Sequence, residues 1–234
     1  MYGSASNHPE SHRPRRAAIP TPTIDELDLA DEPERWRALG FDVHGEQCTL
    51  GSVRVRLLGA GSGRGITAWS LRGLLSSDLD GLPTRTSSSE LRERAPAHPN
   101  GVVAIDHVVV FSPDLDRTIA ALQTAGLDLR RVREEPTPAG APRQAFFRLG
   151  EVILEVVQAP AEAVQRGGGA ERPARLWGLA LLAADLADTV ERIGEHAGEI
   201  RAAVQPGRQI ATVRGSAGLA LALALMSPEP ARAR

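Results

Sequence analysis

The chain has 234 residues, of which 42% are hydrophobic and 24% charged, and its formal net charge is −2 at pH 7. This length and composition predict one or two domains with a sizeable buried core. The small net charge and the pI near 6.3 indicate no basic surface for nucleic acid or anionic lipid. All 27 residues of the Lys-plus-Arg count are Arg, which is typical of a GC-rich bacterial genome and excludes Schiff-base chemistry on lysine.

The single cysteine and the polar ends of the chain indicate in which cellular compartment the protein is expected. Because Cys48 has no partner, an intramolecular disulfide and a cysteine-based zinc site are excluded, and we expect a reducing, cytoplasmic compartment. Residues 1–18 lack an apolar h-region and predict a disordered tail, as do residues 229–234. The longest apolar run, 218–226, is too short to span a bilayer as a helix. We therefore expect neither a membrane nor a nucleic acid as partner.

In chain order, residues 19–77 fit a degenerate βαβββ module. It would consist of a strand at TIDELDLAD, a short helix at EPERWRALG and three short strands at FDVHG, EQCTLG and SVRVRLLG. Residues 78–101 are rich in Ser, Pro, Gly and charge, which predicts a linker.

Residues 102–160 and 174–228 show the same order of elements more clearly. Each has an apolar strand, an Asp-Leu turn that starts a helix, and three further strands, of which the middle one starts near an Arg-Gln pair. In the helix of residues 102–160, Leu115, Ile119 and Leu122 share one face. Self-similarity of this kind indicates duplicated units, so the sequence predicts an α+β fold of tandem βαβββ modules.

The segments AIDHVVV-x-x-PDLDRTIAAL and RLG-x-VILEVV, which open and close the middle module, resemble the glyoxalase, bleomycin-resistance and extradiol dioxygenase superfamily, also called vicinal oxygen chelate proteins. The resemblance covers residues 102–228 well and 19–75 weakly. It implies that modules pair into a partly open mixed β-barrel. It is specific for fold and not for function, because such proteins include lyases, transferases, dioxygenases, hydrolases and metal-free binding proteins.

The resemblance also implies a metal site. In metal-using members the ligands come from the first and last strands of each module, and these positions in the middle module are His107 and Glu155. Strand periodicity independently allows both side chains to face one cavity. In the last module Gly178 and Ala222 stand at these positions, so half of the usual site is missing.

The first module offers a third metal ligand, because Glu26 aligns with His107 while Arg56 aligns with Glu155. If the first and middle modules pair, His107, Glu155 and Glu26 form a three-ligand site for Mn, Fe, Zn, Ni or Mg. The short second linker favours pairing of the middle and last modules, which leaves Glu26 in a separate half-barrel. The sequence leaves open whether one divalent metal is bound or none.

Glu155 is also the candidate catalytic residue, since a carboxylate among five apolar neighbours is costly unless it is paired, liganded or open to a wet cavity. In the final strand the alternation of Leu and Ala predicts a smooth Ala-lined wall that suits an apolar ligand, unless Phe146 or Phe147 fills the space. Two arginines that open equivalent strands are candidates for an anionic substrate group. The substrate-binding candidates are Arg143, Phe147, Gly178, Arg208 and Ala222.

Three functions fit this pattern. The first is a metal-assisted enzyme of lyase, isomerase or dioxygenase type acting on a small oxygen-bearing substrate. The second is a metal-free protein that binds or sequesters a small molecule, against which the low aromatic content of 3% argues. The third is assembly, in which an unpaired module completes its half-barrel in a homodimer.

Overall fold

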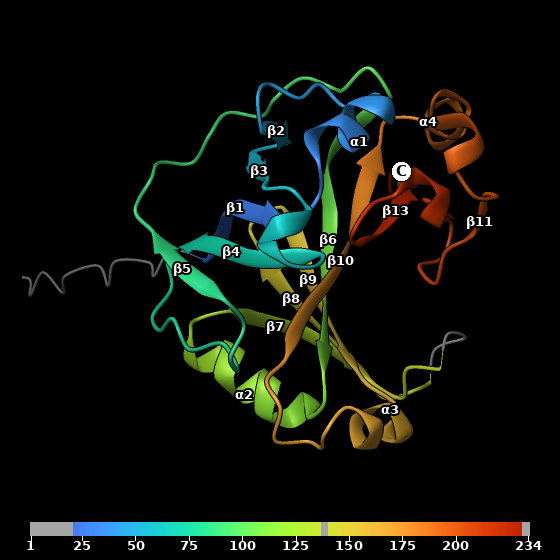
Figure 1. Ribbon diagram of the computed structural model, residues 1–234. Helices are drawn as coiled ribbons and strands as arrows, with labels where there is room; N and C mark the ends of the chain where they lie inside the picture. The colour runs from blue at the N-terminus through green and yellow to red at the C-terminus, as the bar shows by residue number, and fades with distance from the viewer. Residues whose placement is uncertain (1–20, 137–139, 231–234) are drawn as a thin grey trace, which may run out of the picture.

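The computed structural model describes residues 21–136 and 140–230 (Figure 1). The strands of these residues form two mixed sheets, one with five strands and one with eight. The predicted α+β fold is confirmed. Its strands lie in two open sheets and do not form a closed barrel. The tail expected at residues 1–18 lies outside the described residues, as do residues 231–234 of the second expected tail.

The eight-stranded sheet contains the middle and last modules, in the order β11-β12-β13-β10-β6-β9-β8-β7. The modules meet where β6 and β10 pair antiparallel, and each of these strands pairs in parallel with the last strand of its own module, β9 or β13. The middle and last modules therefore pair with each other. The elements are β6 (Val102–Ser112), α2 (Leu115–Thr124), β7 (Asp128–Arg133), β8 (Gln144–Leu149), β9 (Val152–Gln158), α3 (Ala161–Arg166), β10 (Arg175–Ala183), α4 (Leu186–Ile193), β11 (Arg201–Ala202), β12 (Gln209–Thr212) and β13 (Ala222–Met226).

The Asp-Leu landmarks start the two long helices as predicted. The Asp114 carboxylate accepts a hydrogen bond from the Arg117 backbone N–H at 3.1 Å at the start of α2. At the start of α4, Asp185 accepts from the N–H groups of Ala187 at 2.9 Å and Asp188 at 3.1 Å. Each cap satisfies N–H groups that have no partner within the helix, so the helix begins at a fixed point after the first strand of both modules.

The five-stranded sheet repeats the central part of the larger one. Its order is β2-β3-β1-β4-β5, and β1 lies between a parallel β3 and an antiparallel β4, just as β6 lies between β9 and β10. β4 in turn pairs in parallel with β5, as β10 pairs with β13. The elements are β1 (Thr23–Leu29), α1 (Pro33–Ala38), β2 (Gln47–Leu50), β3 (Val53–Leu57), β4 (Ile66–Arg72) and β5 (Thr84–Ser87).

β4 and β5 thus occupy the places of a second, shortened module. The segment 78–101, expected to be a linker, contributes β5 to the sheet. The strand expected at FDVHG is reduced to an isolated bridge between His44 and Gln47. Because β4 pairs with β1, the first module already has a partner within the chain, and the reason for expecting a homodimer does not apply.

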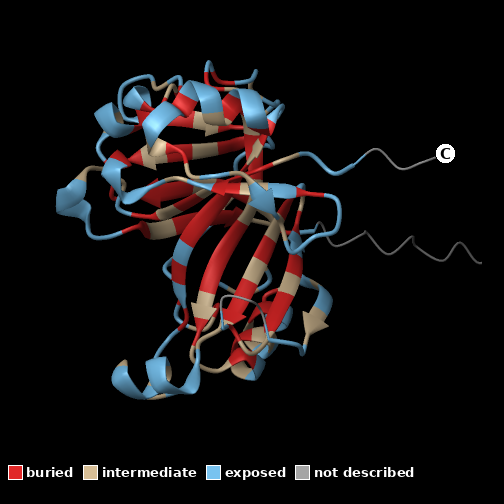
Figure 2. Cartoon of the chain, turned by 90° about the vertical axis from the view of Figure 1, so that its right-hand side faces the viewer, coloured by how far each residue is buried: buried red, intermediate tan, exposed pale blue. Residues whose placement is uncertain are grey.

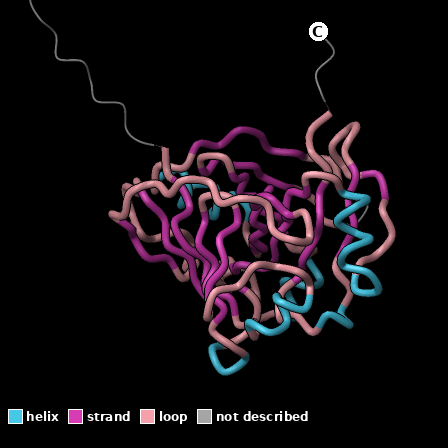
Figure 3. Tube along the Cα trace, turned by 90° about the horizontal axis from the view of Figure 1, so that it is seen from above, coloured by secondary structure: helices cyan, strands magenta, loops and turns pink. Residues whose placement is uncertain are grey.

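The two sheets share one hydrophobic core. Trp36 of α1, Trp69 of β4 and Phe147 of β8 are fully buried in it. Figure 2 shows the buried strands with exposed helices and turns around them, and in Figure 3 most of the helical segments lie at the margin of the strands. Within the described residues, no helix is long and apolar enough to cross a membrane.

The closest approach of two strands predicts a sensitive position. A Cβ on Gly178 of β10 would lie 2.6 Å from the carbonyl oxygen of Ala222 on β13 and 3.1 Å from its Cβ. We expect Gly178→Ala to lower the free energy of unfolding in urea by about 1–3 kcal/mol, because backbone cannot move aside as a side chain can. Gly215→Ala is the control, since its Cβ would meet nothing within 4 Å. Equal stability of the two variants would contradict the close approach.

Candidate functional site

A β-bulge in β6 organises the candidate site. Ala180 pairs with His107 and Leu181 pairs with Ile105, so Asp106 is an extra residue without a partner on β10. Bulges of this kind re-aim a side chain that would otherwise point to the opposite face. The Asp106 side chain therefore lies beside that of His107, and the Asp106 Oδ2 is 2.8 Å from the His107 Nδ1.

The structure brings His107 and Glu155 together as the sequence predicts. The His107 Nε2 lies 3.4 Å from the Glu155 Oε2, and the two side chains are 13% and 15% exposed. We call the face of the eight-stranded sheet that carries them the site face. The opposite face, with Val108 and Val110, belongs to the common core together with α2 and α4.

Glu155 is held by a second polar side chain. The Gln144 Nε2 on β8 donates a hydrogen bond to the Glu155 Oε1, while the Gln144 Oε1 is buried without a partner. Burial raises the pKa of Glu155, and the charge of His107 and the hydrogen bond from Gln144 only partly oppose this. The carboxyl group is therefore suited to take up and release a proton closer to neutral pH than an exposed Glu.

Arg208 anchors the other end of this chain of contacts. It lies just before β12, and its Nη2 is 2.5 Å from the Asp106 Oδ1 on β6, across β13 and β10. Burial acts to raise the pKa of Asp106, but hydrogen bonds from His107 and Arg208 outweigh it and lower the pKa. The contact with Asp106 fixes the His107 ring so that its Nε2 faces Glu155.

Glu26 is not part of this group. It lies on β1 of the other sheet, where its Oε1 is 2.7 Å from the Arg54 Nη1. In the part of the chain that the structure describes, no three His, Cys, Asp or Glu side chains lie close enough together to hold a metal ion. Any metal at His107 and Glu155 thus needs a donor of another kind.

The predicted substrate-binding residues are spread over the molecule. Arg143 is engaged by Glu134 at 2.7 Å and by Asp116 at 3.1 Å. Phe147 is fully buried in the common core, and Phe146 is the residue paired with Glu155. Arg208 is buried against Asp106, whereas Gly178 and Ala222 are paired neighbours on the site face.

An apolar strip continues the site face beyond the polar group. Val109, Ala141 and Val157 form a small buried cluster with Phe111, whose ring is 4.8 Å from that of Trp177. A pocket of about 610 Å³ begins at Phe111 and runs along α3. Neither His107 nor Glu155 lines this pocket, so the polar group lies outside it on the same face of the sheet.

The sequence prediction missed Asp106 and Gln144. In a regular strand, Asp106 and His107 would point to opposite faces, so only one of them was assigned to the site. Two signals were present: two consecutive polar residues inside an apolar strand, and the recurrence of Ile-Asp as Ile24-Asp25 and Ile105-Asp106. Both are consistent with a bulge at the same place in the two halves of the chain, at Asp25 and at Asp106.

Comparison with known proteins identifies the family. Residues 104–219 match the model of the Glyoxalase/Bleomycin resistance protein/Dioxygenase superfamily. Residues 104–219 therefore form a domain of this superfamily. No curated protein matches the sequence.

Solved structures agree with the fold. A triple mutant of 4-hydroxymandelate synthase from Streptomyces coelicolor superimposes with a TM-score of 0.62 at 14% identity, over 92% of this chain and 95% of that one. A xylose isomerase-like TIM barrel/4-hydroxyphenylpyruvate dioxygenase fusion protein gives 0.59 at 13% identity, over 92% of this chain. This chain spans half the length of the fusion protein. At these identities the likeness concerns the fold alone, and it extends over both sheets.

Proposed function

We propose that the site face is the active site of a metal-assisted enzyme, of lyase, isomerase or dioxygenase type, that acts on a small oxygen-bearing substrate. One observation carries the proposal: Asp106 orients His107 so that Nε2 faces the Glu155 carboxylate at 3.4 Å. A carboxylate on the far nitrogen of an imidazole is the usual support of a metal-binding histidine. Superfamily membership is compatible with this function and with several others.

The donors present fit one divalent ion if Gln144 takes part. Its Oε1 is a buried oxygen without a partner, next to the amide nitrogen that binds Glu155. A half-turn of the amide exchanges the two atoms. His107, Glu155 and Gln144 would then supply one nitrogen and two kinds of oxygen, a set suited to Mn, Fe or Zn with positions left for water and substrate.

When bound, such an ion would polarise a substrate oxygen. The protein side chains have separate tasks. Glu155 accepts or returns a proton at a substrate carbon or oxygen through the carboxylate oxygen that does not hold the ion. Asp106 keeps the His107 ring in place, and Val109 and Val157 limit the access of water on one side.

The test is a calorimetric titration of the full chain with Mn²⁺. We expect one site, and we expect His107→Ala to weaken binding by more than about 100-fold, beyond the effect usual for a residue that only supports a ligand. His44→Ala is a matched control, because His44 also faces a carboxylate, Asp42 at 3.3 Å, on the exposed surface. Equal affinity of His107→Ala and His44→Ala would refute the proposal.

The apolar strip favours a second candidate, a metal-free protein that binds an apolar molecule against Phe111, Val109 and Val157. This function predicts that the fluorescent dye ANS binds equally well to the wild type and to Glu155→Gln, with or without EDTA. Loss of dye binding in Glu155→Gln would exclude it.

For location we propose the cytoplasm. The only cysteine, Cys48, is a free and buried core thiol, so the chain uses no intramolecular disulfide, which suits a reducing compartment.

A further inference from the structure

The five-stranded sheet has a face equivalent to the site face. In β1, Ile24 pairs with Leu71 and Glu26 pairs with Ser70, so Asp25 is an extra residue just as Asp106 is in β6. Counting from the bulge, Glu26 takes the place of His107.

The neighbouring strands extend this equivalence. Arg56 pairs with the second residue after Glu26, as Glu155 pairs with the second residue after His107. Arg85 pairs with Ser70, as Ala224 pairs with Ala180. Arginine therefore stands where the site face has a carboxylate and where it has an alanine.

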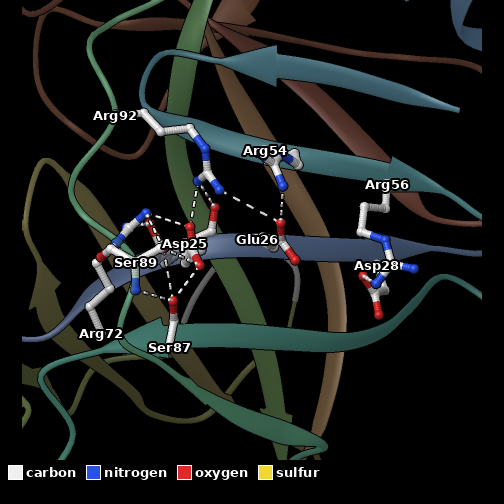
Figure 4. A network of polar contacts seen from close by, with 10 residues as sticks. Asp25, Glu26, Asp28, Arg54, Arg56, Arg72, Ser87, Ser89 and Arg92 are labelled. Carbon is white, nitrogen blue, oxygen red and sulfur yellow. Dashed lines mark hydrogen bonds and ion pairs between the residues drawn. The ribbon is translucent and has the colours of Figure 1, made fainter. Parts of the chain in front are cut away.

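We call this surface the arginine face (Figure 4). Its charged residues are Arg54, Arg56, Arg72, Arg85, Arg92, Asp25, Glu26 and Asp28. Five guanidinium groups face three carboxylates, which leaves a formal excess of two positive charges, whereas the chain as a whole is acidic.

Two of the five arginines have most of their donors occupied by groups of the arginine face itself. Arg72 and Arg92 both bind the Asp25 carboxylate, and they also donate to the backbone carbonyls of Ile24 and Asp25. Their side chains are only 11% and 22% exposed. Ser87 and Ser89 also donate hydrogen bonds to the Asp25 carboxylate, so the groups around Asp25 are already paired with one another and are not offered to a ligand.

The other three arginines keep most of their donors free. Arg54 reaches Glu26 at 2.7 Å, while Arg85 and Arg56 share Asp28 at 2.8 and 3.4 Å. Each uses one nitrogen in these contacts, although a guanidinium carries five N–H donors. The three side chains are 38%, 46% and 39% exposed, in the order named, so the remaining donors are open to solvent.

The space between these arginines contains the Glu26 and Asp28 carboxylates of β1 and, beside them, the small side chains of β4. β1 and β4 separate β3, which carries Arg54 and Arg56, from β5, which carries Arg85. On β4 the residues of this face are Ala68 and Ser70, which pair with Asp28 and Glu26. A ligand group of a few atoms above them would meet Arg85 on one side and, across the carboxylates of β1, Arg54 and Arg56 on the other.

We propose that the arginine face binds the carboxylate or phosphate group of a small ligand above Ala68 and Ser70, held by Arg54, Arg56 and Arg85. Planar guanidinium groups suit both anions, because each can donate two parallel hydrogen bonds to a pair of anionic oxygens. This site is separate from the proposed metal site and does not depend on it.

The experiment is a calorimetric titration of the full chain with inorganic phosphate and, separately, with succinate, at constant ionic strength set by chloride. We expect saturable binding of at least one anion, weakened at least tenfold in Arg85→Gln and in Arg54→Gln. Arg130→Gln is the control, because Arg130 is 60% exposed and also has one carboxylate partner, Asp128.

The anion that binds more tightly shows whether the site prefers a phosphate or a carboxylate group. His107→Ala is expected to bind the anion as the wild type does, which separates this result from the metal titration. The proposal is overturned if neither anion binds better than chloride, or if Arg85→Gln and Arg130→Gln bind equally well.

Discussion

Replacing Arg208 by Met is expected to lower the free energy of unfolding by about 3–5 kcal/mol. The Arg208 side chain is 8% exposed, and it is the only cation in contact with the Asp106 carboxylate apart from His107 among the described residues. It also donates to the Ser227 carbonyl at 2.6 Å. Its removal leaves a buried carboxylate and a carbonyl without their strongest donor, while Met preserves most of the apolar volume.

Urea denaturation of the purified chain measures this effect. The matched control is Arg192→Met, because Arg192 forms an exposed ion pair with Asp188 at 2.9 Å within one helix. Exposed pairs of this spacing contribute only about 0.3–0.5 kcal/mol. A loss of stability in Arg208→Met no larger than that in Arg192→Met would show that the contact across β13 and β10 is absent in solution.

Asp25→Asn is expected to destabilise the protein by about 3 kcal/mol at pH 7. The change removes the carboxylate that Arg72 and Arg92 share, and it leaves two poorly exposed guanidinium groups side by side. Asp128→Asn is the control, since Asp128 and Arg130 form an exposed pair.

The effect of Asp25→Asn depends on pH. Burial acts to raise the pKa of Asp25, but hydrogen bonds from Ser87, Ser89 and Arg92 prevail and lower it below 3.8. Its stabilising contribution is therefore complete above the pKa of the unfolded chain and disappears as the pH falls through the folded value. The difference in unfolding free energy between wild type and Asp25→Asn should shrink below about pH 4. A difference that is constant from pH 7 to pH 3 would contradict the ionised network.

Residues 102–228 could be predicted from the sequence because their elements repeat. The strands have clear apolar periodicity, and the Asp-Leu turns mark the helix starts, so the positions of β6, α2, β9, β10 and α4 followed from local patterns. The same periodicity placed His107 and Glu155 on one face, and their contact at 3.4 Å agrees with it.

The pairing of β4 and β5 with β1 could not be predicted in the same way. This shortened module lacks a helix, and β5 has only four residues, Thr84–Ser87, in a polar segment. Such a strand is specified by the edge that it joins, and that edge is visible only in the folded chain.

The contacts of single side chains also could not be predicted from the sequence. One bulge moves Asp106 to the site face, and the length of the Arg208 side chain lets it reach across two strands. Phe146 and Phe147 were equally apolar neighbours, and only the register of β8 with β9 decides that Phe146 pairs with Glu155 while Phe147 joins the core. Register is set by contacts along whole strands and cannot be derived from one of them.

The most direct test of the proposed active site is anomalous diffraction from a crystal of the full chain grown with Mn²⁺ and recorded near the manganese absorption edge. The account predicts one strong peak within about 2–2.3 Å of the His107 Nε2 and of a Glu155 oxygen, with Gln144 turned so that its Oε1 faces the ion. Density for Mn²⁺ only elsewhere, or an unchanged contact between His107 and Glu155 in a crystal saturated with Mn²⁺, would contradict it.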